Sequence, residues 1–193
     1  DPDTGGAVAT PLFVLEQGVL RLDRMDARLP DAVVLASPEE RLTLTQNGAS
    51  ASLDVQPANR FALDGATAAV TALGVTSSEG WTLALTSAEA EVTRVHGETS
   101  AYDIAAQARD MRPPAPLRDL LDPGALLPET IAEADAILRV TFDAPWDLDA
   151  VEVARPQPQE IVIDEISAHW GDMLFRTSGT LEVTPGGVPE GEL

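Results

Sequence analysis

The residues that most often do chemistry in proteins are scarce in this chain. It contains two histidines, His96 and His169, and no cysteine. His96 lies in the turn-like segment RVHGETS, and His169 precedes Trp170 in a strand, so an exposed loop position and a partly exposed sheet position are the ordinary interpretations. Neither histidine has a second ligand at metal-binding spacing, and the lack of cysteine excludes disulfides, thiolate nucleophiles and zinc–thiolate sites. We therefore predict no catalytic residue, no metal and no cofactor, and we do not expect an enzyme.

The charge excludes further classes of function. The chain has 32 acidic and 12 basic residues, all of the basic ones arginine, for a net charge of -20. Such a chain is repelled by nucleic acids and by anionic lipid headgroups. No acidic run has the ligand spacing and the glycine of a calcium loop. The acidity therefore predicts a solvated outer surface.

Three tryptophans stand out, because aromatic residues make up only 4% of the sequence. Trp81, Trp146 and Trp170 all fall at the starts or ends of expected strands. One interpretation is that their indoles close the ends of a thin aliphatic core. The other is that they line the mouth of an apolar groove that holds a ligand.

The elements that position these residues are mainly strands. From Met173 to Val183 the side chains alternate between two faces, which indicates a half-buried strand, and Gly171-Asp172 supplies a tight turn before it. A related pattern, in which the alternation slips by one residue, recurs and predicts a β-bulge or bend in each strand. Its five copies begin at Leu22, Leu63, Leu85, Ile131 and Ile163.

Other segments complete the expected fold. Asn47-Gly48 is a strong hairpin signal between strands at 41–45 and 49–55. The proline-rich segment Met111–Thr130 predicts a short helix over Pro116–Leu121, in a plug or lid that packs over one end of the sheet. Residues 143–159 are expected to form a loop around Trp146. The fold class is thus mainly β: a curved antiparallel sheet, half-barrel or taco-like, with a short helical insertion, in a single domain over residues 1–193.

Several sequence stretches together resemble the alphaproteobacterial family catalogued as domain of unknown function 2125. These are the opening DPDTGGAVATPLF, SSEGWTLAL from Ser77, DPGALLPETI from Asp122, VTFDAPWD from Val140, RPQP from Arg155, and HWGDMLFRTSGTLEV through GVPEGEL. The resemblance implies a periplasmic envelope protein with an amino-terminal inner-membrane anchor and a distant likeness to AsmA-like proteins. It carries over no catalytic residue. It also implies that this chain is an internal fragment, since neither an anchor nor a span of membrane-crossing length appears in it.

Two hypotheses for the function follow. In the first, a concave apolar face of the sheet holds a lipid or another apolar ligand. In the second, the chain is a structural or partner-binding envelope domain, with a closed core and edges that pair with other envelope proteins. For the first hypothesis, the candidate ligand-binding residues are Trp81, Leu83, Leu85, Phe142, Trp170 and Phe175.

Overall fold

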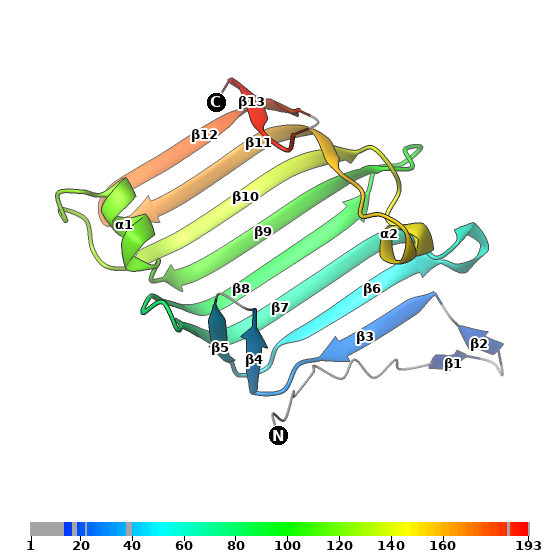
Figure 1. Ribbon diagram of the computed structural model, residues 1–193, viewed down its shortest axis with the longest axis horizontal. Helices are drawn as coiled ribbons and strands as arrows, with labels where there is room; N and C mark the ends of the chain where they lie inside the picture. The colour runs from blue at the N-terminus through cyan, green and yellow to red at the C-terminus, as the bar shows by residue number, and fades with distance from the viewer. Residues whose placement is uncertain (1–13, 17–18, 22, 38–39, 185, 193) are drawn as a thin grey trace.

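The structure is a computed structural model that describes residues 14–16, 19–21, 23–37, 40–184 and 186–192 (Figure 1). It is mainly β, with 62% of residues in strands, and its long sheet is antiparallel and not closed into a barrel. The predicted fold class is therefore confirmed. No helix of the described part is long and apolar enough to cross a membrane.

The strands follow one another along the chain with two helices and one short 3-10 helix between them. They are β1 (Val14–Glu16), β2 (Val19–Arg21), β3 (Arg24–Arg28), β4 (Ala32–Ala36), β5 (Arg41–Thr45), β6 (Ser50–Gln56), η1 (Pro57–Asn59), β7 (Ala62–Ser77), β8 (Thr82–Arg94), β9 (Ala101–Met111), α1 (Ala115–Leu121), β10 (Ile131–Phe142), α2 (Leu148–Glu152), β11 (Pro158–Trp170), β12 (Met173–Val183) and β13 (Pro189–Glu192). The β1–β2 hairpin forms a sheet of its own, and the remaining strands form one sheet. The helix expected over Pro116–Leu121 is confirmed as α1.

Strand β7 organises the sheet because it is shared by three partners. On one side it pairs with β8, and the sheet continues through β9, β10, β11 and β12 to β13. On the other side its first part pairs with β6 and its last part, Gly74–Ser77, pairs with β5. Outside these, β3 pairs with β6 and β4 with β5.

The arrangement of β5 and β6 corrects the prediction of a hairpin at Asn47-Gly48. These strands do not pair with each other but lie end to end along the same edge of β7. The connecting segment is held by β7 itself, since Asn47 N–H donates to the carbonyl of Thr71 over 2.8 Å and the Thr71 hydroxyl donates to the carbonyl of Asn47. Gly48 has a φ of 83°, so the chain does turn at Asn47-Gly48 as predicted. The two strands that the turn joins pair with the long strand β7 and not with each other.

Two of the predicted slips in alternation are β-bulges. The β6–β7 register shifts between Asp54 and Val55, leaving Asp64 as the extra residue of β7. The β10–β11 register shifts between Ile137 and Leu138, leaving Asp164 as the extra residue of β11. Each bulge resets the parity, which keeps the apolar side chains of its strand on one face.

The slips at Leu85 and Ile131 arise differently, because no extra residue enters the ladder there. Thr86 lies opposite Ala72, and Ala132 lies opposite Asp110, between pairs whose register is continuous. Ala72 and Asp110 both have left-handed backbones, with φ of 51° and 50°, so the ladder is creased rather than bulged. The first copy begins at Leu22, which lies outside the described residues, so its slip is described only in part.

Segments from two loops cover opposite ends of one face of the sheet, as Figure 1 shows. The first is the α1 flap, which we define as residues 112–130. The second is the α2 flap, residues 143–157, which was expected to be a loop without a helix. Its helix is capped by Asp147, whose carboxylate accepts hydrogen bonds from the backbone of Asp149 and Ala150. Side-chain capping of this kind stabilises a five-residue helix that has too few residues to show a periodic pattern.

Candidate functional site

The face between the two flaps is floored by alanines. Successive cross-strand pairs join Ala27, Ala51, Ala68, Ala90, Ala106 and Ala136 in one row across β3, β6, β7, β8, β9 and β10. A second row contains Ala88, Ala108, Ala134 and Ala168. We call these ten residues the alanine belt. Since neighbouring strands lie about 4.8 Å apart, the first row extends for roughly 24 Å across the sheet.

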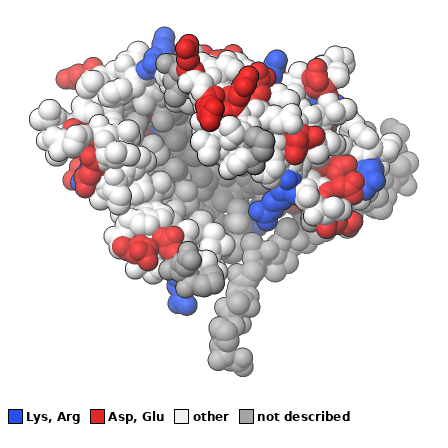
Figure 2. Space-filling view, turned by 45° about the horizontal axis from the view of Figure 1, so that its top comes forward, with Lys and Arg blue, Asp and Glu red and all other residues white. Residues whose placement is uncertain are grey.

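Larger aliphatic side chains border the belt on the side of α2. The next row of the same face joins Leu53, Val92, Ile104, Leu138 and Ile163 through cross-strand pairs that include Ala66. A row of methyl groups beside a row of longer side chains makes a shallow trough. Figure 2 views the molecule from this side and shows a hollow near its centre, with many of the charged side chains around its rim.

Tyr102 anchors the α2 end of this face and is the most deeply buried of the described core residues, at 1% exposure. Its ring makes an edge-on contact with Phe142 at 6.0 Å, and Phe142 makes another with Trp146 at 5.6 Å. Its hydroxyl donates to the carbonyl of Leu63 over 3.5 Å and accepts from the backbone N–H of Trp146 over 3.4 Å. Burial raises the pKa of this hydroxyl, an effect that the hydrogen bond from Trp146 partly offsets.

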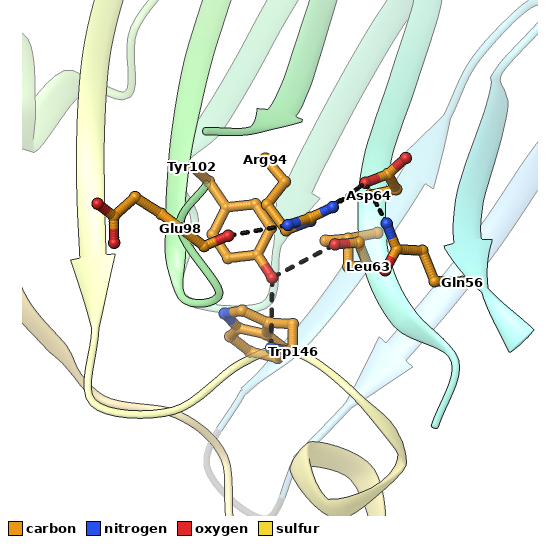
Figure 3. A network of polar contacts seen from close by, with 7 residues as sticks. All are labelled: Gln56, Leu63, Asp64, Arg94, Glu98, Tyr102 and Trp146. Carbon is orange, nitrogen blue, oxygen red and sulfur yellow. Dashed lines mark hydrogen bonds and ion pairs between the residues drawn. The ribbon is translucent and has the colours of Figure 1, made fainter. Parts of the chain in front are cut away.

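A polar network lies beside Tyr102 (Figure 3). The Arg94 guanidinium donates to Asp64 over 2.7 Å and to the carbonyl of Glu98 over 2.8 Å, and Gln56 donates to Asp64 over 3.1 Å. Asp64 is the extra residue of the β7 bulge. The bulge therefore directs a carboxylate toward the arginine of the neighbouring strand while Leu63 stays on the apolar face.

The α2 flap reaches from β10 to the start of β7 and so closes this end of the trough. Leu63 N–H donates to the carbonyl of Trp146 over 2.7 Å, and Leu148 N–H donates to that of Arg60 over 3.1 Å. Arg60 also forms ion pairs with Asp147, at 3.8 Å, and with Asp149. Exposed pairs of this kind contribute little, so the backbone bonds and the aromatic contacts carry most of the attachment.

The α1 flap is held at the opposite end by Trp170. Its indole is 3% exposed, and its Nε1–H donates to the carbonyl of Pro128 over 2.6 Å. Phe175 lies beside the indole, with ring centroids 6.4 Å apart. Within the flap, the buried Asp122 carboxylate accepts hydrogen bonds from the backbone of Leu126 and Leu127, over 3.1 and 2.8 Å. The flap therefore has an internal frame and one strong attachment to the sheet.

Comparison with known proteins gives a family. The model of the family described as "Uncharacterized protein conserved in bacteria (DUF2125)" matches residues 1–193. The chain belongs to the DUF2125 family. No curated protein and no solved structure matches it. The family named from the sequence stretches is thus confirmed.

The DUF2125 sheet does not bring the six candidate ligand-binding residues together. Trp170 and Phe175 are neighbours under the α1 flap. Trp81, Leu83 and Leu85 lie at the same end of the sheet, where Ala84 forms a bridge with Arg112 at the start of that flap. Phe142 lies at the other end, in the cluster with Tyr102. Strand β10 joins the two ends with twelve residues, a length of roughly 40 Å.

Reasoning from the sequence missed the alanine belt and Tyr102. A signal for the belt was present, since Ala66-Ala68, Ala88-Ala90, Ala106-Ala108 and Ala134-Ala136 all alternate. The predicted ligand-binding residues were all large apolar side chains, so these alanines were not among them. The two histidines lie as expected, both exposed, and the described residues include no group of three side chains that could hold a metal ion.

Proposed function

We propose that this DUF2125 chain is a periplasmic, inner-membrane-anchored envelope domain with a non-enzymatic role, and that it holds the acyl chain of a lipid on the alanine belt. The observation that carries the proposal is the belt itself, an apolar face left open between flaps that cover only its ends. An apolar face that remains accessible in a folded chain is typical of a site for an apolar partner.

The dimensions of the belt support an acyl chain as the ligand. Half of the hydrocarbon core of a bilayer, the depth that one acyl chain fills, is about 15 Å. The first row of the belt is roughly 24 Å long, and its small side chains allow an apolar chain to lie close to the backbone. Met25, Leu53 and Ile166, on the same face, are 40%, 39% and 37% exposed. A bound chain would remove these side chains from water.

A second candidate function, a partner-binding envelope domain, is favoured by one specific observation. Two leucines of the α1 flap, Leu120 and Leu126, are 77% and 87% exposed. The frame around Asp122 holds Leu126 in place, so its exposure belongs to a fixed structure. Large exposed apolar side chains of this kind are typical of protein contacts.

A pair of variants of neighbouring alanines tests the first function. Ala106 lies in the belt at the middle of β9, and Ala105 lies next to it on the opposite face. We expect Ala106→Phe to weaken binding of a fluorescent fatty acid and to lower the amount of lipid that co-purifies from the native host. Ala105→Phe should leave both unchanged. Equal lipid content in the two variants would exclude the belt as the site, and lipid-free protein would favour partner binding.

A further inference from the structure

The α1 flap presents an apolar surface to solvent. Leu117, Leu120 and Leu121 follow the i, i+3, i+4 spacing of one helix face, and no described residue of α1 is buried. A fourth exposed leucine, Leu126, lies in the loop that follows, which extends past the ends of β10 and β11 in Figure 1. We call these four leucines the flap tip. An amphipathic helix normally turns its apolar face toward the core, so an exposed apolar face indicates a partner.

The flap tip is uncharged and fixed in shape. Within residues 120–128, all of which the structure describes, the one ionisable side chain is Asp122. It is buried, and its carboxylate accepts hydrogen bonds from the backbone N–H groups of Leu126 and Leu127. Although the chain has a net charge of -20, its flap tip can therefore enter an apolar phase without desolvating a charge.

More exposed apolar side chains lie at the same end of the sheet. The turn between β11 and β12 contacts the flap, since a Cβ on Gly171 would lie 2.9 Å from Pro128 Cδ. Directly after this turn, Met173, Leu174 and Phe175 are between 41% and 52% exposed. Two separate elements thus expose apolar side chains next to each other, which makes the surface wider than the flap tip alone.

A guanidinium group lies beside the leucines of the flap tip. Arg118 follows Leu117 in α1, and its ion pairs with Asp119 and Glu129 span 4.0 and 3.8 Å, which is beyond hydrogen-bonding distance. Arginine donors of this kind bind phosphate oxygens well. The flap therefore combines an apolar tip with a cation at its side, the order in which acyl chains and phosphates follow each other in a bilayer.

The composition of the tip distinguishes a bilayer from a protein as the partner. Protein contacts draw most of their binding energy from Trp, Tyr and Arg, and leucine is under-represented among such residues. Residues 120–128 contain four leucines and no aromatic residue. A leucine-rich face with a cationic residue beside it is typical of a segment that lies in a membrane interface. We infer that the α1 flap inserts its tip into a phospholipid bilayer, with Arg118 at the level of the phosphates.

Flotation with phosphatidylcholine vesicles tests the inference on matched variants. The flap variant combines Leu120→Gln and Leu126→Gln. The control combines Val153→Gln, in the α2 flap, and Val188→Gln, in the turn before β13, which replace side chains that are 79% and 56% exposed. Loss of two half-inserted leucines predicts a partition coefficient about tenfold lower in the flap variant. The control should change by less than about twofold, because its residues lie outside the contact.

The net charge predicts how binding depends on lipid and salt. Because anionic headgroups repel this acidic chain, exchange of part of the phosphatidylcholine for phosphatidylglycerol should weaken binding. Added salt should restore part of the loss by screening the repulsion. The opposite pattern, stronger binding to phosphatidylglycerol and weaker binding in salt, would mean adsorption by charge and would overturn insertion.

A single label reports whether the tip enters the bilayer. Because the chain has no cysteine, Leu126→Cys offers one thiol for an environment-sensitive fluorophore. Its emission should shift to the blue on vesicles, and that of a label at Val153→Cys should not. Equal shifts at the two positions would contradict insertion through the flap.

The test separates this inference from the proposed lipid site. Ala106→Phe alters the alanine belt but not the flap tip, so this variant should bind vesicles as the wild type does. A wild-type chain that ignores the vesicles, or equal losses in the flap variant and its control, would overturn docking even if fatty-acid binding to the belt were confirmed. The leucines would then belong to the partner-binding function.

Discussion

Replacing Trp170 by phenylalanine should release the α1 flap while the sheet stays folded. The substitution removes the 2.6 Å hydrogen bond to the carbonyl of Pro128, which contributes about 1 kcal/mol, and loses up to about 1 kcal/mol of packing as the ring shrinks. The hydrogen bond exists only while the flap is closed. A loss of about 1–2 kcal/mol should therefore increase the open fraction roughly 5- to 30-fold.

Limited trypsin digestion measures this opening. The chain has no lysine, Arg112 precedes a proline that blocks cleavage, and Arg118 lies in α1. The rate of cleavage after Arg118 should therefore follow the open fraction when opening is fast relative to cleavage. The matched control is Trp81→Phe, since the Trp81 indole N–H has no hydrogen bond among the described residues. Equal cleavage rates after Arg118 in the two variants would refute the role of Trp170 as the attachment.

Two further variants test other contacts. Gly171→Ala should lower the free energy of unfolding by about 1–3 kcal/mol in urea titrations, because Gly171 has a φ of 62° and a Cβ there would meet Pro128 Cδ at 2.9 Å. The control Gly80→Ala, at a φ of 88° with open space around it, should lower the free energy of unfolding by less. Equal losses in the two variants would contradict the contact between Gly171 and the flap. In Tyr102→Phe, the free energy of unfolding should fall less steeply as the pH rises above neutral. Burial raises the Tyr102 pKa above its usual value of 10.0, so the unfolded chain loses this proton first and stability falls above about pH 10; an unchanged slope in the variant would show that other groups cause the loss.

Local patterns in the sequence determined the strands and most turns. The strand predicted from Met173 to Val183 and the turn at Gly171-Asp172 both appear, in β12 and the β11–β12 hairpin, but burial alternates only from Thr177 onward, because residues 173–176 are all exposed. The bulges after Leu63 and Ile163 follow from the single-residue slip in their apolar patterns, whereas the same slip at Leu85 and Ile131 gives a crease; the pattern therefore predicts a bend but not its kind. The helix at Ala115–Leu121 followed from its prolines and leucines. These features depend on residues that are close together in the chain.

The tertiary structure alone decided which strands pair and where the flaps attach. Asn47-Gly48 has the sequence of a hairpin, yet β7 is long enough to pair with both β5 and β6, and its ladder replaces the hairpin. Tyr102 anchors the α2 flap because the backbone N–H of Trp146, which is distant in the sequence, donates a hydrogen bond to its hydroxyl. The alanine belt exists only when alanines of six strands come into register, and register is a property of the whole sheet. The sequence therefore determined the kind of sheet, and long-range pairing determined which of its residues form a surface.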